Sequence, residues 1–282
     1  MELDKRRLIV NADDFGRSRE INHAVIRAHR EGILTTASLM VTGEAFDEAV
    51  TLARANPTLG VGLHLTLVCG VPVLDPREVP MLVRPAVAPR KNSTFLENPV
   101  TAGITFFFNQ DAKLQVEREI EAQFTRFYQT GLPLDHVNGH LHFHLHPTVL
   151  DILLRRAAEW GIKRMRLTRD LPGLSLMTAS GRICYRLSHT VIFGILAAWS
   201  KRKFKAAGIL HTDQVFGLLQ DTLVDAEYIQ RLLPLLPEGI SELYSHPSTD
   251  LFVNELEGLV APGVLEMVKQ EGIELIRYQD LG

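Results

Sequence analysis

The chain has 282 residues, of which 46% are hydrophobic and 22% charged, and its formal charge is -3 at pH 7. This composition is typical of a folded globular protein and excludes a largely disordered chain. Nucleic-acid-binding domains are usually strongly basic, whereas this chain is close to neutral, so we expect no nucleic-acid partner. The two cysteines, Cys69 and Cys184, cannot form a disulfide framework and favour a reducing cytoplasm.

The chain carries no stretch that predicts a membrane span or a secretory signal. Residues 1–7 are polar and charged, and the apolar run at 8–10 is too short for a signal peptide. The longest apolar run, 191–199, falls well below the ~20 residues that a bilayer-spanning helix needs. We therefore expect a cytoplasmic protein, attached at most to the inner face of the membrane.

Short apolar runs alternate with amphipathic stretches from one end of the chain to the other. Helices are predicted at 21–28, 45–55, 226–233 and 262–270, from near Leu114 to a stop at 131–133, and after Pro147. Strands are predicted at 7–13, 37–41, 60–66, 134–142, 163–168, 214–218, 240–245 and 273–278. This alternation predicts a parallel sheet with crossover helices. We expect one domain over residues 1–282, an irregular (β/α) TIM-like barrel with seven or eight parallel strands, and a doubly wound open sheet is the alternative.

Two insertions interrupt this pattern, at about residues 70–111 and 173–208. The first holds six prolines and lacks periodicity, which is typical of a functional or mobile loop. The second contains the longest apolar run, with basic residues on both sides: Arg182, Arg186, Lys201, Arg202, Lys203 and Lys205. A hydrophobic helix with basic flanks can lie in a membrane interface or cover a lipid tail, whereas a buried barrel helix is the alternative.

Polar side chains stand at the carboxyl ends of four predicted strands, which form the active face of a barrel. They are Asp13, Asp14, His64, His140 and His246. Two imidazoles and one carboxylate bind a divalent ion and leave a position for water, whose pKa the ion lowers. A second carboxylate can then act as general base and a further histidine as general acid. Each residue alone could cap a helix, fill the core or lie in a loop, but their joint placement favours a metal-hydrolase site.

The local patterns around these residues give further expectations. Adjacent Asp13 and Asp14 point to opposite faces of a regular strand, so both reach one site only if the strand ends there. Five histidines between 136 and 146 share parity and would face one side of an extended chain. Among them we expect His140 to be the metal ligand and His142 and His144 to contact the substrate.

Four motifs resemble the YdjC-like (chitooligosaccharide deacetylase) family of carbohydrate deacetylases. They are Asn-Ala-Asp-Asp-Phe-Gly at 11–16, Gly-Leu-His-Leu at 62–65, His-Val-Asn-Gly-His-Leu-His at 136–142 and Ser-His-Pro at 245–247. The resemblance covers essentially the whole chain and implies an irregular (β/α) barrel that removes acetyl groups from N-acetylated amino sugars with a divalent ion. It implies the following roles by position: metal ligands Asp14, His64 and His140, base Asp13, and acid His246. Asn138 departs from the pattern, because many members carry Asp there.

Within the family, residues 105–121 and the apolar insertion resemble the branch associated with hopanoid biosynthesis. This resemblance implies a hopanoid glycolipid substrate, N-acetylglucosaminyl bacteriohopanetetrol, and peripheral membrane contact through residues 182–205. The alternatives are a deacetylase of soluble chitooligosaccharides, a metal-dependent barrel hydrolase of another bond, and a non-catalytic sugar- or metal-binding barrel. Zn²⁺ suits the His/His/Asp set best, with Mg²⁺ as the alternative. The oligomeric state is left open.

Overall fold

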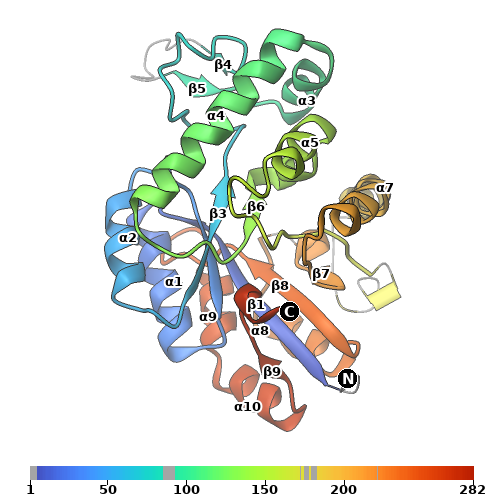
Figure 1. Ribbon diagram of the computed structural model, residues 1–282. Helices are drawn as coiled ribbons and strands as arrows, with labels where there is room; N and C mark the ends of the chain where they lie inside the picture. Colours follow the sequence, from blue (N-terminus) through green and yellow to red (C-terminus); the bar gives the residue numbers. More distant parts are fainter. Residues whose placement is uncertain (1–4, 85–92, 172, 175–177, 179–182, 221) are drawn as a thin grey trace.

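The computed structural model describes residues 5–84, 93–171, 173–174, 178, 183–220 and 222–282. Its centre is a seven-stranded parallel sheet that curls into a half-barrel, with helices packed around it (Figure 1). The strand order is β6-β3-β2-β1-β8-β7, and β9 pairs with the beginning of β1. The strands are β1 (Arg6–Phe15), β2 (Thr36–Leu39), β3 (Gly60–Leu65), β6 (Val137–Gly139), β7 (Gln214–Phe216), β8 (Gly239–Ser245) and β9 (Glu274–Leu275).

The helices alternate with these strands along the chain, as the sequence pattern predicts. They are α1 (Arg19–Glu31), α2 (Phe46–Arg54), α3 (Pro99–Phe108), α4 (Gln110–Gln129), α5 (Pro147–Arg155), α7 (Ile183–Ala207), α8 (Ala226–Leu232), α9 (Val253–Val260) and α10 (Pro262–Gln270). The first of them starts at Ser18, whose side chain accepts a hydrogen bond from the backbone N–H of Ile21. This cap lies three residues beyond β1, so it fixes the chain directly after the first strand.

The central strands are buried on both faces. Every residue from Leu8 to Phe15 in β1 is buried, and so are all residues of β3. Parallel strands covered on both sides read as continuous apolar runs, which is why the sequence pattern identified them. The polar residues that do occur within these strands, such as Asp13 and His64, are therefore desolvated side chains that need partners.

Residues 163–169 join the two edges of the sheet. The backbone N–H of Val137 in β6 donates to the carbonyl oxygen of Arg164 at 3.0 Å, and that of Val215 in β7 donates to the carbonyl oxygen of Arg169 at 2.9 Å. The strand predicted at 163–168 is therefore an irregular segment that forms isolated bridges to its neighbours. Its position between β6 and β7 agrees with a barrel-like arrangement of the sheet.

The strand predicted at 134–142 is confirmed only over Val137–Gly139. Only β6 is extended, and a 3-10 helix follows over His140–Leu145, with Leu141 and His142 at positive φ (50° and 57°). Side chains alternate between two sides only along an extended chain. Their parity predicted that the five histidines between 136 and 146 would share one face. Because the chain leaves the extended conformation after Gly139, they do not.

Both predicted insertions contain regular structure. The first holds a small hairpin, β4 (Val83–Arg84) with β5 (Thr94–Phe95), followed by α3, and residues 85–92 lie outside the described part. The second holds α7, while Arg182 and residues 172, 175–177 and 179–181 lie outside the described part. None of the described helices combines the length and the apolar character needed to cross a membrane.

Candidate metal centre

A bulge at the end of β1 brings the two adjacent aspartates to one side. The pairing of β1 with β2 shifts register between Ala12 and Phe15, and Asp14 adopts a positive φ of 63°. A bulge adds a residue to one strand and re-aims its side chains, so Asp13 and Asp14 need not point apart. From the sequence, Asp13 and Asp14 could share a site only if the strand ended at them. The strand instead continues one residue further, to Phe15. Asp13 and Asp14 are both buried, with 2% of their surface exposed.

His64 lies in β3 and presents one unpaired nitrogen to Asp14. Its Nδ1 atom lies 2.7 Å from the side-chain oxygen of Asn138, whose amide nitrogen donates to the Asp13 carboxylate at 2.9 Å. Because a carboxylate only accepts, the Asn138 amide oxygen must face His64, which fixes the proton on Nδ1 of the neutral ring. The Nε2 atom then carries a lone pair, 3.3 Å from Oδ1 of Asp14, and it is buried with no hydrogen-bond partner in the described part of the chain.

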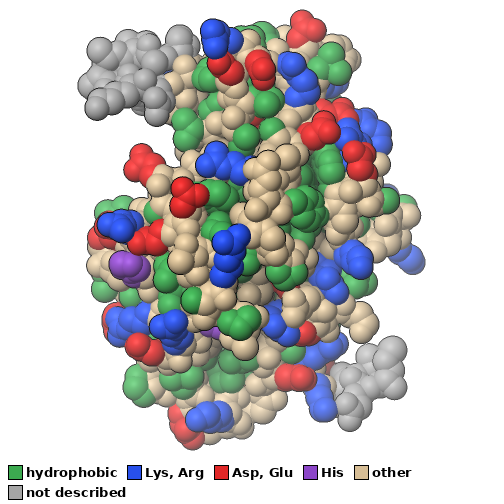
Figure 2. Space-filling model, turned by 60° about the vertical axis from the view of Figure 1, so that its left-hand side comes forward, with side chains coloured by type: hydrophobic (Ala, Val, Ile, Leu, Met, Phe, Trp, Pro, Cys, Tyr) green, Lys and Arg blue, Asp and Glu red, His purple; other side chains and the backbone are tan. Residues whose placement is uncertain are grey.

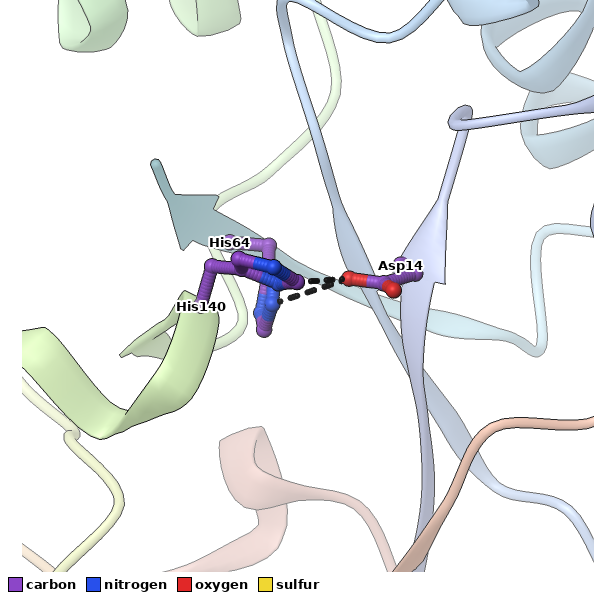
Figure 3. Close-up of side chains that lie close together, drawn as sticks. All are labelled: Asp14, His64 and His140. Atoms are coloured by element: carbon purple, nitrogen blue, oxygen red, sulfur yellow. Dashed lines mark hydrogen bonds and ion pairs between the residues drawn. The ribbon is translucent and has the colours of Figure 1, made fainter. Parts of the chain in front are cut away.

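His140 completes a compact cluster of three ligand-type side chains. It is the first residue of the 3-10 helix after β6, and its Nδ1 atom lies 3.0 Å from the same Oδ1 atom of Asp14. Figure 3 shows both imidazoles directed at the Asp14 carboxylate from neighbouring strand ends. One ligand atom from each of Asp14, His64 and His140 lies within 4.8 Å of the others. Burial alone would raise the pKa of Asp14, but His140 beside it holds this pKa well below its usual range.

The chemistry of this donor set fits a divalent cation. Two imidazole nitrogens and one carboxylate oxygen are the ligand types of zinc sites that keep a position open. The buried lone pair of His64 faces a carboxylate oxygen, and two acceptors that face each other at this distance are stabilised by a cation between them. The hydrogen bond to Asn138 fixes the orientation of the His64 ring, as outer hydrogen-bond partners do beside metal-bound histidines.

Asp13 is held by a fully buried ion-pair network. Arg166 donates to both oxygens of Asp13, at 2.7 Å and 3.0 Å, and also to Glu242 at 2.7 Å. Burial of Asp13 opposes ionisation, but the Arg166 guanidinium holds the pKa of this carboxyl well below its ordinary value. Asp13 therefore stays ionised, with Asn11 and Asn138 donating to its Oδ1 atom as well.

Sequence reasoning did not identify Arg166 and Glu242 as members of this network. Each is a charged residue inside a predicted apolar strand, at 163–168 and 240–245. A charge at such a position indicates a buried ion pair, and this pattern could have identified them. A fully buried arginine requires paired acceptors, because an unpaired buried charge is very costly. Their partners became visible only when β8 and residues 163–169 were placed beside β1 and β6.

A cavity of about 520 Å³ opens onto this cluster. The side chains that line it include Asp13, His64, His140, His142 and His246. His246 follows β8, and its backbone N–H donates to the buried Glu255 carboxylate. His142 lies between Tyr244 and Thr168, at 3.1 Å and 3.2 Å, and burial and Arg166 hold its pKa well below the usual value.

Two of the clustered histidines lie away from the cavity wall. His144 is fully buried, and its Nε2 atom donates to the backbone oxygen of Arg166 at 3.0 Å. This placement gives His144 no surface to offer a substrate, in contrast to the sequence-based expectation. His136 is also buried, between Asp135 and Ser38, and its ring stacks on Tyr278.

The fold and the site together define an α/β protein with three candidate cation ligands at the carboxyl edge of a curled parallel sheet. Among known families, the model of the YdjC-like proteins matches residues 7–270. The chain therefore belongs to the YdjC-like protein family.

Curated relatives and solved structures are consistent with this membership. A carbohydrate deacetylase of Brevibacillus brevis is 43% identical over 156 residues, which are 55% of this chain and 57% of that protein. The matched part thus spans little more than half of the length of this relative. Carbohydrate deacetylase 2 of Listeria innocua is 29% identical over 98% of both chains. A crystal structure from Enterococcus faecalis, assigned provisionally as a cellobiose-phosphate cleavage protein, has a TM-score of 0.73 at 24% identity and 98% coverage of both chains, which shows the same fold.

Proposed function

We propose that the protein is a metal-dependent carbohydrate N-deacetylase that hydrolyses the acetamido group of an N-acetylglucosamine-type sugar. The observation that carries this proposal is the buried Nε2 atom of His64, which faces Asp14, has no hydrogen-bond partner among the described residues and belongs to a ring that lines the cavity. The names of the relatives from Brevibacillus brevis and Listeria innocua support the same reaction.

Asp14, His64 and His140 would hold the cation, with Zn²⁺ the best match to two imidazoles and one carboxylate and Mg²⁺ the alternative. A divalent ion bound there supplies Lewis-acid chemistry, because it lowers the pKa of water and polarises a carbonyl oxygen. The outer hydrogen bond from His64 to Asn138 keeps the ligand nitrogen deprotonated and its ring in one orientation.

Asp13 and His246 would move the protons of this hydrolysis. The Oδ2 atom of Asp13 accepts one hydrogen bond, from Arg166, within the described part of the chain, so a lone pair remains for the proton of the attacking water. His246 lines the same cavity and would protonate the nitrogen of the departing amine. The products are acetate and a free amino sugar.

The cavity favours a substrate whose sugar carries an apolar group. Its wall beyond the cluster is formed largely by apolar side chains of α3, α7 and the 3-10 helix, among them Val100, Phe143, Ile192 and Leu196. An apolar group attached to the sugar would bury more of this surface than the hydroxyl groups of a soluble oligosaccharide. We therefore propose a lipid-linked acetylated amino sugar, such as the hopanoid glycolipid that the sequence resemblance implies, with peripheral membrane contact through residues 182–205.

Acetate release separates this proposal from its rivals. We expect metal-loaded protein to release acetate from N-acetylglucosaminyl lipids, and Asp13→Asn to abolish the release while the metal stays bound. The matched control is Asp47→Asn, an exposed acid on α2, which should keep full activity. Phosphate release without acetate release would favour a barrel hydrolase of another bond. Ligand binding without any turnover would favour a non-catalytic barrel.

The lipid part of the proposal has its own comparison. The glycolipid and a soluble chitooligosaccharide of the same sugar are offered at equal concentration, and acetate is measured. We expect the larger kcat/KM for the glycolipid, because it has an apolar part that can contact α3 and α7, and the soluble sugar has none. A clear preference for the soluble sugar would contradict the lipid-linked substrate but not the deacetylase.

A further inference from the structure

Three exposed apolar side chains stand around the mouth of the cavity. Val100 in α3, Leu141 in the 3-10 helix and Ile192 in α7 line the cavity, and they are 68%, 48% and 51% exposed. They come from three separate elements, so the apolar rim is a property of the assembled site. Exposed apolar residues that are contiguous with a binding site mark an interaction surface more often than isolated ones do.

The apolar surface continues outward along α3. Its exposed side chains Val100, Ile104, Phe107 and Phe108 follow helical spacing, while Ala102 and Phe106 are buried on the opposite face. The helix contains no charged residue. An exposed helix face of this kind in water is unfavourable unless another apolar surface covers it.

On the other side of the mouth, α7 carries an apolar stripe that ends in basic residues. Val191 and Ile195 are 61% and 68% exposed, and Arg202 lies on the same face, seven residues after Ile195. The helix contains no Asp or Glu, while Lys201, Arg202 and Lys205 are exposed. In contrast, acidic and basic side chains are intermixed on the side of the molecule that carries α2 and α4 (Figure 2).

We propose that α3, the rim and α7 together form a docking surface for a lipid bilayer that contains anionic lipids, with the mouth of the cavity toward the membrane. This inference rests on the proposed function, because a lipid-linked sugar would then reach Asp14, His64 and His140 from the bilayer. The apolar side chains enter the headgroup boundary, and the basic end of α7 contacts lipid phosphates. The absence of acidic residues from both helices removes the repulsion that a mixed surface would meet.

Vesicle sedimentation tests the surface without any turnover. The full chain is mixed with vesicles of phosphatidylcholine alone, or of phosphatidylcholine with phosphatidylglycerol, and the bound fraction is measured. We expect binding to the mixed vesicles and weaker binding to the neutral ones. Ile195→Ser and Phe108→Ser should each weaken binding about tenfold, since each removes an exposed apolar side chain that the bilayer would cover. Arg202→Gln should weaken it about fivefold on the anionic vesicles.

Matched controls lie at the other end of the barrel. One control is Leu235→Ser, at a residue that precedes β8 and is 37% exposed, and the other is Lys269→Gln in α10. Both variants should bind vesicles as the parent protein does. Protein that stays in the supernatant with both kinds of vesicle would overturn the proposal. A dimer in solution that Ile195→Ser dissociates would also overturn it, in favour of a second copy of the chain. Acetate release from a soluble acetylated sugar, measured on the same samples, reports the proposed function separately.

Discussion

The Nε2 atom of His64 lies 3.3 Å from the Oδ1 atom of Asp14, and the proton of the neutral His64 ring lies on the opposite nitrogen, toward Asn138. Two acceptor atoms are thus brought together in a buried site. Both come from strand ends that adjoin β2, and His140 reaches the same oxygen from the end of β6. This arrangement predicts how the site responds to the removal of individual groups.

Asn138→Ala should weaken metal binding more than it affects folding. The amide of Asn138 orients His64 at 2.7 Å and also donates to Asp13. Loss of an outer hydrogen-bond partner typically lowers metal affinity about 10- to 100-fold. Zinc competition with a chromophoric chelator measures this affinity. Asn254→Ala, an exposed amide on α9, is the matched control and should leave it unchanged.

Asp13→Asn should lower kcat by about 100- to 10,000-fold, because the loss of a general base costs a rate factor of this size. The Asn side chain keeps the size of the original, and Asp14, His64 and His140 are untouched, so bound metal should remain. Acetate release and elemental analysis on one preparation measure both quantities. Full activity of this variant would contradict the role of Asp13.

Arg166→Met should strongly destabilise the fold. The guanidinium is fully buried between Asp13 and Glu242, so its removal leaves two buried carboxylates without their cation. Breaking a buried ion pair from one side costs about 3–5 kcal/mol of unfolding free energy. Urea unfolding measures the change. Arg27→Gln, on the exposed face of α1, should leave the unfolding midpoint in place, and an equal loss in both variants would contradict the explanation.

Acidification should destabilise the protein through His144. Burial and Arg166 lower the pKa of His144 to about 3, from an ordinary value of 6.5. Between these two values the unfolded chain binds a proton that the folded chain does not, so stability falls as the pH falls from about 6.5 toward 3. The slope from this residue is about 1.4 kcal/mol per pH unit. His144→Gln should make the measured slope shallower, whereas His23→Gln, an exposed ring on α1, should not.

The sequence predicted most of the regular elements, because buried parallel strands and amphipathic helices carry strong hydrophobic patterns. The strand and helix boundaries of β3, α2 and α10 agree with the prediction within one residue. Residues 163–168 have the same apolar pattern but form only isolated bridges, since pairing depends on the neighbours that tertiary structure supplies.

The candidate site was accessible to sequence reasoning only in part. The rule that parallel strands end at one edge of the sheet predicted that polar residues of several strands lie together there, and the family resemblance singled out Asp14, His64 and His140 among them. The positive φ values of Asp14 and His142 follow from no such rule. Asp and His adopt this conformation more often than most non-glycine residues, but too rarely for the residue type to predict it at a given position. For that reason the bulge that turns Asp14 toward the site and the early end of β6 were not predicted.

The most direct test of the account is the metal content of the purified protein after dialysis against zinc and then against metal-free buffer. We predict one divalent ion per chain in the parent protein and in His29→Ala, whose ring lies on α1 away from the cluster. We predict none in the double variant His64→Ala/His140→Ala, provided that its circular dichroism spectrum is unchanged. A parent protein that retains no ion, or a double variant that retains it fully, would contradict the assignment of this site.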